Sequence, residues 1–286
     1  MSTTLGAIAT PRRLSRRAAA IGPVGTAAAI LIAIATIVAI IGPWIAPHDP
    51  NATDGITLQF QRAPGHPLGY DANGRDVLSR LLAGARTSML GPLVVVVASI
   101  ALGVAIAIAA AWRGGRFDTL VGGALDIAFA FPAILLAILA AAVFGAGLFA
   151  AVAVLSFAYT PYIARVVRGS AMQERSKPYI AALEVQGFSA WKICARHLLP
   201  NVSGVVVAQA TILFGYAMVD LAAISFIGLG VQPPNADWGV MIFENRQGIA
   251  LGKPVPALVG GICLVVVVIA FNLLGERLAQ RSERSR

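Results

Sequence analysis

The chain has 286 residues, of which 58% are hydrophobic and only 12% are charged, and its net charge is +9. Soluble globular domains carry about 25% charged residues, so this composition excludes an ordinary water-soluble protein and predicts a chain embedded mainly in lipid. The basic residues are spread over several short polar segments, which argues against a nucleic-acid-binding protein.

Six segments are apolar for long enough to cross a bilayer, which takes about 20 residues. They cover roughly residues 18–47, 87–112, 119–144, 148–164, 202–228 and 254–274. The third carries Asp126, and a glycine-containing turn at residues 145–147 separates it from the fourth. The predicted fold class is therefore an all-α integral membrane protein with about six transmembrane helices.

The Lys and Arg residues predict the orientation, because short cytoplasmic loops carry an excess of both. If the N-terminus is cytoplasmic, 16 of the 22 lie inside, and the outer ones are Arg62, Arg75, Arg80, Arg86, Arg246 and Lys253. We expect a multi-pass protein of the cell membrane with both termini in the cytoplasm. A cleaved signal peptide is the competing interpretation of the first span, but the apolar run is too long for one and lacks an A-x-A exit.

These spans divide the chain into a basic cytoplasmic tail (1–20), a transmembrane domain (21–281) and a second tail (282–286). Within the domain, an outer segment covers about residues 46–88, and an inner loop covers about residues 165–201. From Arg75 onward, apolar residues at helical spacing predict a short helix that leads into the second span. In the last outer loop, Trp238 is expected at the membrane interface rather than at a substrate site.

Motifs for independent catalysis are absent from the sequence. It has no G-x-x-x-x-G-K-[ST] loop, no H-E-x-x-H or paired Cys/His metal motif, and no G-x-S-x-G elbow. The histidines His48, His66 and His197 are scattered over both predicted sides, and Cys194 and Cys263 are expected to be free thiols. We therefore expect no metal site, no cofactor and no ATP hydrolysis by this chain alone.

Two carboxylates lie inside the predicted spans, Asp126 and Asp220. An ionisable group at membrane depth costs about 2.5–3.5 kcal/mol or more and is a functional candidate by default. A structural alternative applies to each. Asp126 would pair near the inner interface with Arg113, Arg116 or a neighbouring subunit, and Asp220 would join helices by hydrogen bonds.

The inner loop contains the sequence ERSKPYIAALEVQGFSAWKICARHLLPNV. Pro178 suits the first position of a helix, and Gly187 suits the left-handed position after a helix end. Ser189 is placed to cap a second helix that would run to Pro200. Two short helices meeting at a glycine hinge are therefore expected, either lying in the lipid headgroups or docking into a cytoplasmic partner.

Four stretches resemble the permease subunits of bacterial ABC importers, specifically the second permease of the dipeptide/oligopeptide/nickel group. They are HPLGYDANGRDVLSRLLAGARTS, DIAFAFPAILLAIL, YIAALEVQGFSAWKICARHLLPN and FIGLGVQPPNADWG. The resemblance covers nearly the whole chain past residue 20. It implies a type I permease core with a cytoplasmic coupling-helix loop, the E-A-A-x-x-x-G-x9-I-x-L-P loop that enters a cleft of an ATPase subunit.

Within that pattern, Ala182, Gly187, Leu199 and Pro200 match, and Arg196 opens the R-H-x-L-P-N ending of the subgroup. The departures are Ala181 at the family's Glu position, Leu183 in place of Ala and His197 in place of Ile. Glu184 lies three residues after Ala181, displaced by most of a turn. In the outer stretch, Tyr70 stands where the group usually has Thr.

The resemblance also implies the partners and the mechanism. Two permeases form a pseudo-twofold pore in the lipid membrane, each docks one cytoplasmic ATPase, and an extracytoplasmic binding protein delivers the substrate. ATP-driven closure of the ATPases would pull on the inner loops and switch access, with Asp126, Pro132 and Asp220 shaping the path.

Di- and oligopeptides are the favoured substrates, with nickel chelates or glutathione as the alternative within the group. Outside the group, a secondary transporter without ATPase partners and a lipid-binding membrane scaffold remain rival hypotheses.

Overall fold

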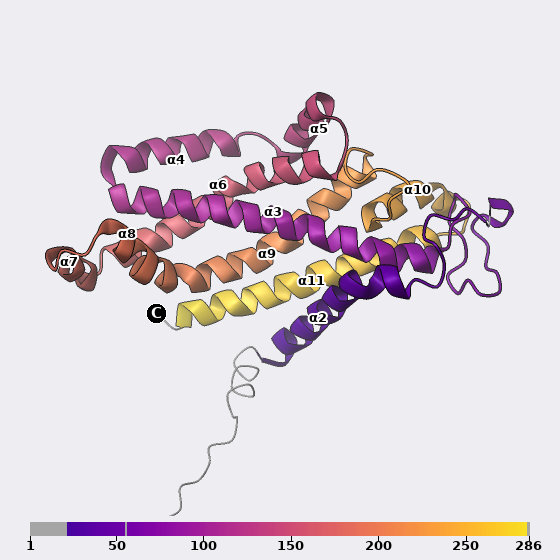
Figure 1. The fold of residues 1–286 in the computed structure, drawn as a ribbon, viewed down its shortest axis with the longest axis horizontal. Helices are drawn as coiled ribbons and strands as arrows, with labels where there is room; N and C mark the ends of the chain where they lie inside the picture. Colours follow the sequence, from indigo (N-terminus) through magenta and orange to yellow (C-terminus); the bar gives the residue numbers. More distant parts are fainter. Residues whose placement is uncertain (1–21, 55, 285–286) are drawn as a thin grey trace, which may run out of the picture.

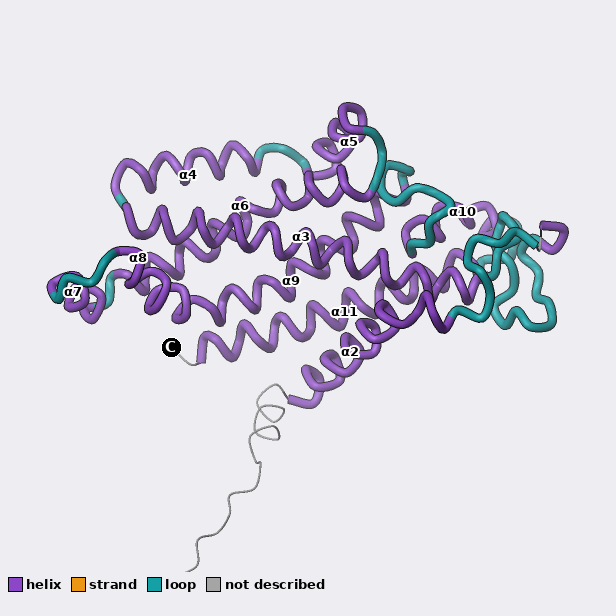
Figure 2. Tube along the Cα trace, in the orientation of Figure 1, coloured by secondary structure: helices purple, strands orange, loops and turns teal. Residues whose placement is uncertain are grey.

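The structure, a computed structural model, describes residues 22–54 and 56–284. Long helices lie side by side in one bundle, and loops and short helices collect at its two ends (Figures 1 and 2). The long helices are α2 (Gly22–Ile45), α3 (Val77–Arg113), α4 (Gly115–Phe129), α6 (Leu148–Arg175), α9 (Leu199–Phe226) and α11 (Val255–Arg284). The shorter ones are η1 (Ile56–Leu58), α5 (Ala133–Phe144), α7 (Pro178–Val185), α8 (Ala190–Ile193), the π-helical turn η2 (Cys194–Leu198) and α10 (Trp238–Ala250).

Five helices are long and apolar enough to cross a membrane, and a bent pair provides a sixth candidate span. The five cover Gly22–Ile45, Val77–Arg113, Leu148–Arg175, Ala190–Phe226 and Val255–Arg281. The all-α membrane fold with about six spans is therefore confirmed. The first tail, residues 1–20, lies outside the described residues, and α11 continues through residues 282–284, where the second tail was expected.

The third predicted span is not one straight helix. It consists of α4 and α5, which meet at 78°. Pro132 stands at the break as the N-cap of α5, with an extended backbone (φ −60°, ψ 130°). Proline has no N–H to donate and disfavours helical backbone in the residue before it, so the break has a local cause. Figure 1 shows α4 running along α3, with α5 turned away at the far end.

Small residues allow the helices to approach closely. A Cβ added to Gly103 of α3 would lie 2.8 Å from Ile163 of α6, and one added to Gly42 of α2 would lie 2.2 Å from the carbonyl oxygen of Leu82. Close approach at small residues is how helices pack in a membrane, where burying apolar area gains little. Large apolar side chains on the outside of the bundle, such as Ile37 and Leu139, are free to face lipid.

The two ends of the bundle differ, and they are called here the α7 end and the α10 end after the short helix that each carries (Figure 1). The α10 end also contains η1 and the loops of residues 46–54 and 59–76. The separate short helix expected after Arg75 is in fact the first part of α3, which is continuous from Val77 to Arg113. Asp76 caps it by accepting a hydrogen bond from the backbone N–H of Ser79 at 2.8 Å.

Candidate functional site

The helix α7 projects from the bundle at the end opposite α10 (Figure 1). Pro178 occupies its first turn, as predicted, and Gly187 follows its end with φ +79°. The Gly187 N–H donates to the Glu184 carbonyl at 3.0 Å, and the Phe188 N–H donates to the Leu183 carbonyl at 3.1 Å. These paired bonds form a Schellman motif, which satisfies the last carbonyls of the helix and reverses the chain.

The second half of the inner loop differs from the prediction. Ser189 does cap a helix, but that helix does not end at Pro200, because α8, η2 and α9 run on as one 37-residue span from Ala190 to Phe226. At the π-helical turn, the Leu199 N–H donates to the Cys194 carbonyl five residues back. Pro200, which has no N–H to donate, directly follows this turn, so the helix passes the proline at a local change of hydrogen-bond pattern.

Apolar side chains stand exposed on this projection. Val185 is 89% exposed and Trp191 is 81% exposed, and Ala181 and Ala182 on α7 are exposed as well. Lys192 lies against the Phe188 ring, 4.3 Å from its centre. An exposed apolar patch bordered by a cation is typical of a surface that contacts another protein.

The residues predicted for ATPase coupling form two neighbouring groups. Ala182, Leu183 and Glu184 lie on α7, with Gly187 just after it, whereas Arg196, His197, Leu199 and Pro200 lie on η2 and the first turn of α9. The groups meet where the His197 ring lies 6.4 Å from the Tyr179 ring. Glu184 pairs only distantly with Arg175, at 3.8 Å.

A buried carboxylate anchors α7 to the bundle. Glu174, 6% exposed at the end of α6, accepts hydrogen bonds from Tyr179 of α7 at 2.7 Å and from Asn201 of α9 at 2.9 Å. It also pairs with Lys177 at 2.7 Å. Three helices are thus joined at one side chain. This junction has no signature in the sequence, because Glu174 and Asn201 are 27 residues apart and belong to different helices.

An apolar groove of about 490 Å³ lies at the same end of the bundle as α8. It runs between α3 and the start of the long Ala190–Phe226 helix. Its lining includes Trp112, Arg113, Trp191, Cys194 and Leu199. Leu199, predicted as a coupling residue, therefore faces this groove rather than α7.

The three predicted path residues do not form one cluster. Asp126 pairs with Arg165 of α6, not with Arg113 or Arg116, and both members of the pair are at least half exposed. Pro132 lies at the α4–α5 break. Asp220 accepts a hydrogen bond from the Tyr159 hydroxyl of α6 at 2.6 Å.

At the α10 end, a buried charge cluster joins distant segments. Arg80 of α3 is fully buried and donates to Glu244 of α10 at 3.1 Å and to the carbonyl of Pro50 at 3.1 Å. Arg75 bridges Asp71 and the same Glu244. We call Asp71, Arg75, Arg80 and Glu244 the charge clasp. It holds the segment before α3 against α10.

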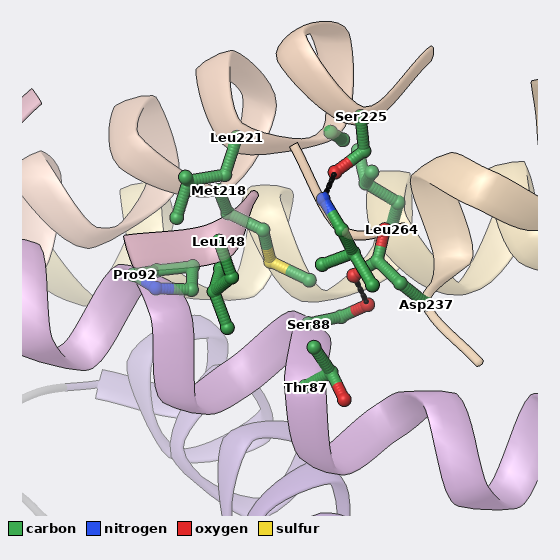
Figure 3. Close-up of a pocket in the computed structure, with 11 residues that line it drawn as sticks. Thr87, Ser88, Pro92, Leu148, Met218, Leu221, Ser225, Asp237 and Leu264 are labelled. Carbon is green, nitrogen blue, oxygen red and sulfur yellow. Dashed lines mark hydrogen bonds between the residues drawn. The ribbon is translucent and has the colours of Figure 1, made fainter. Parts of the chain in front are cut away.

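A second carboxylate fixes the start of α10. Asp237 caps this helix and accepts a hydrogen bond from the Ser88 hydroxyl at 2.7 Å (Figure 3). Burial raises the pKa of Asp237, although the bonds from Ser88 and from backbone N–H groups oppose that shift. The adjoining cavity, of about 10 Å³, has room for about one water molecule.

Trp238, which was predicted to lie at the membrane interface, is enclosed by the protein. It is 4% exposed, and its indole N–H donates to the Leu81 carbonyl at 3.0 Å. Its partners lie about 150 residues away on α3, so local pattern could not place it.

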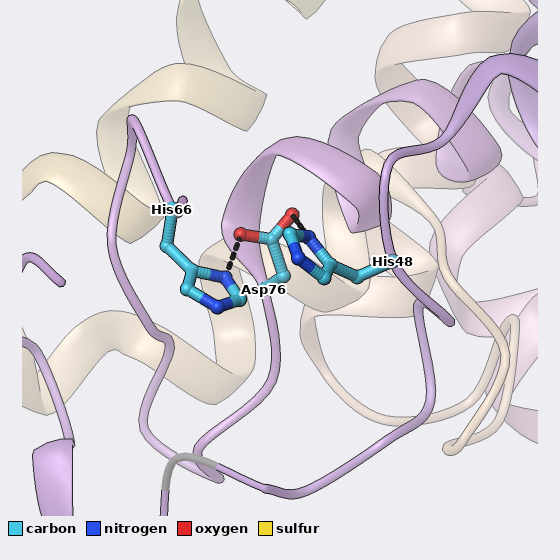
Figure 4. Close-up of side chains that lie close together, drawn as sticks. All are labelled: His48, His66 and Asp76. Atoms are coloured by element: carbon cyan, nitrogen blue, oxygen red, sulfur yellow. Dashed lines mark hydrogen bonds and ion pairs between the residues drawn. The ribbon is translucent and has the colours of Figure 1, made fainter. Parts of the chain in front are cut away.

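Two of the histidines treated as scattered come together at the α10 end (Figure 4). The His66 Nδ1 lies 2.8 Å from Asp76, the His48 Nδ1 lies 3.8 Å from it, and the two rings stack at 4.1 Å. His, His and carboxylate can bind a metal. Here the Asp76 oxygens already serve His66 and the Ser79 N–H, and the other His66 nitrogen contacts the Tyr70 hydroxyl at 2.8 Å. The arrangement works as a hydrogen-bonded brace for the start of α3.

Acid is expected to loosen this brace. Burial alone would raise the pKa of Asp76, but hydrogen bonds from Ser79 and His66 outweigh it and lower the pKa below 3.8. Because the folded state binds this proton more weakly than the unfolded state, the stabilisation is present at neutral pH and is lost as pH falls through the lowered pKa. Hydrogen-exchange protection at residues 66–80 should therefore decline below about pH 4. In Asp76→Asn this decline should vanish, and an unchanged profile would contradict the assignment.

Residues 99–284 match the family model described as "Binding-protein-dependent transport system inner membrane component". This match spans more than half of the chain. The chain belongs to this family. Residues 12–64 also match the N-terminal transmembrane domain of oligopeptide transport permease C. The two matches together identify an ABC importer permease of the dipeptide/oligopeptide group, as the sequence motifs predicted.

Relatives of the permease are similar over most of their length. A peptide transport system permease protein of Brucella suis is 39% identical over 95% of this chain and 89% of the relative. A D,D-dipeptide transport system permease protein of Escherichia coli K12 is 32% identical, covering 89% and 85%. A glutathione transport system permease protein of Escherichia coli O6:K15:H31 is 34% identical, covering 88% and 83%.

The permease fold also matches a solved structure. A chain of the MetNI methionine ABC transporter in an inward-facing conformation aligns with a TM-score of 0.57 at 20% identity, covering 71% of this chain and 96% of that one. At this identity the match supports the fold alone. A multi-pass inner-membrane permease follows from the family and from the apolar helices.

Proposed function

We propose that this permease is the membrane subunit of an ATP-driven importer and that its α7 projection docks into a separate cytoplasmic ATPase. The observation that carries the proposal is the combination of an exposed apolar surface, Val185 and Trp191, with a rigid attachment through Glu174. A loosely tethered helix would not transmit motion to the bundle. Because Glu174 bonds to α7 and α9 together, a pull on α7 reaches the long Ala190–Phe226 span.

The proposed orientation places the α7 end in the cytoplasm, together with both chain termini. Basic side chains support this, since Arg113, Arg116, Arg175, Lys177 and Lys192 all lie in or beside the turns of that end. The α10 end, with its loops and charge clasp, then faces the extracytoplasmic binding protein.

Peptides are the proposed substrates, delivered by that binding protein and carried between this permease and a second, homologous one. The named relatives support peptide transport, and two of the three similar proteins described above carry peptide or dipeptide in their names. The similarity to a glutathione transport system permease protein makes the tripeptide glutathione an alternative substrate. Nickel chelates remain the other alternative.

A charge placed on the docking surface is expected to weaken ATPase capture. Val185→Asp inserts a carboxylate at a position that is 89% exposed, so the fold should tolerate it, while an apolar contact with the ATPase would lose about tenfold in affinity or more. Leu251→Asp is the matched control, since Leu251 is 66% exposed at the α10 end. Co-purification of the permease pair with co-expressed ATPases is the measurement.

Full capture of the ATPases by Val185→Asp, or equal loss of capture in both variants, would contradict docking at α7.

Transport in vesicles separates the rival mechanisms. Peptide uptake that requires internal ATP supports the proposal, whereas uptake that persists without ATP and collapses with the ion gradient would identify a secondary transporter.

A further inference from the structure

Asp220 is a carboxylate at membrane depth without a cation beside it. Asp220 lies six residues before Phe226, the last residue of α9. This places it about 9 Å along the helix axis from that end of α9. Two other carboxylates along the spans have a cation, because Asp118 pairs with Arg168 and Asp126 pairs with Arg165. Glu276 is an exposed side chain in the last part of α11. None of the ion pairs within residues 22–54 and 56–284 includes Asp220.

Within the described residues, Asp220 accepts one hydrogen bond, and only one of its two carboxylate oxygens takes part in it. Tyr159 donates to Oδ2 at 2.6 Å, and no donor within the described part of the chain serves Oδ1. The side chain is half-buried rather than enclosed. An ionised oxygen without a partner is costly at membrane depth, so Oδ1 is available to a polar or cationic group other than the described residues.

Polar and aromatic side chains follow the side of α9 that carries Asp220, next to the exposed Val219. Tyr216, one turn before Asp220 on α9, is 52% exposed. Seven residues earlier, Gln209 accepts a hydrogen bond from Tyr162 of α6 at 2.9 Å. Positions 209, 216 and 220 share one side of α9, so these groups form a stripe along the α6–α9 contact. Tyrosine rings and a carboxylate together are the groups that bind an ammonium ion.

We propose that Asp220 binds the free α-ammonium group of a peptide in transit, with the Tyr216 ring beside it and Tyr159 holding the carboxylate in place. This inference rests on the proposed function as a peptide importer. It specifies which part of the substrate the permease itself recognises, namely a cationic amino terminus. A peptide whose amino group is acetylated would lack this contact.

Uptake by vesicles containing the complete importer tests this inference. Each peptide is supplied free and N-acetylated, at concentrations that saturate the binding protein, so that the permease sets the rate. Asp220→Asn keeps the size and an acceptor for Tyr159 but removes the charge. We expect it to reduce uptake of the free peptide by about tenfold or more and to leave uptake of the acetylated peptide nearly unchanged. Asp118→Asn, whose carboxylate pairs with Arg168, is the matched control and should not alter the ratio of the two rates.

Each other outcome has a distinct meaning. Equal loss for both peptides, or no loss for either, would overturn the ammonium site. Loss of the second permease from the purified Asp220→Asn complex would overturn it too, because Asp220 would then pair with a cation of that subunit. If the wild-type importer carries neither peptide, the proposed function itself fails.

Discussion

Replacing Gly187 by valine is expected to uncouple the permease from its ATPases. Gly187 has φ +79°, a left-handed conformation that a β-branched residue adopts only with strain. No heavy atom lies within 4 Å of the position of an added Cβ, so the cost is conformational and not a steric clash. A penalty of about 1–3 kcal/mol is large for α7, because a helix of eight residues is marginal without its cap.

Loss of the Schellman motif would release α7 from its fixed direction, and ATPase capture should fall by about tenfold or more. Co-purification of the ATPases and ATP hydrolysis stimulated by the loaded binding protein measure the effect. Gly187→Asn should retain most activity, since asparagine tolerates left-handed backbone better than other side chains.

Gly252→Val is the matched control for this strain. Gly252 follows α10 with φ +71° and open space around it. The Lys253 N–H donates to the Gly248 carbonyl at 2.8 Å, and the Gly252 N–H donates to Ile249 at 3.2 Å, so the motif is the same. This variant should lose similar stability at the α10 end and keep ATPase capture. Equal uncoupling in both variants, or none in Gly187→Val, would show that α7 does not transmit the motion.

The sequence predicted the features whose cause is local. Long apolar runs require spanning helices, because lipid offers no partner for free backbone groups. Pro178 and Gly187 stand at a helix start and a helix end for conformational reasons that hold in any context. The same reasoning placed Ser189 as a cap.

Features set by tertiary contact were missed. Pro200 was interpreted as a helix end, because no sequence pattern announces the π-helical turn that lets the helix pass it. Trp238 and Arg80 find their partners about 160 residues away in the chain. His48 and His66 belong to a loop whose folding depends on α3. In each case the residue types were visible in the sequence, but their neighbours were not.

Removing Glu244 is expected to be among the most destabilising single changes in the permease. Its carboxylate serves both Arg75 and the fully buried Arg80, with Asp71 as the remaining anion of the charge clasp. Breaking a buried ion pair by deleting one partner costs about 3–5 kcal/mol, because the other charge stays buried and uncompensated. Glu244→Ala should lower the free energy of unfolding in detergent by that amount.

Glu184→Ala provides the contrast, since Glu184 is 45% exposed and lies 3.8 Å from Arg175. An exposed pair of this kind contributes about 0–1 kcal/mol to the free energy of unfolding.

A second comparison isolates the buried charge. Arg80→Met combined with Glu244→Gln removes one cation and one anion and leaves the neutral Asp71–Arg75 pair. The loss of unfolding free energy in the double variant should therefore be about 1–3 kcal/mol smaller than the sum of the two single losses. Two results would contradict this role of the charge clasp. One is additive losses in the double variant, and the other is a loss in Glu244→Ala no larger than the loss in Glu184→Ala.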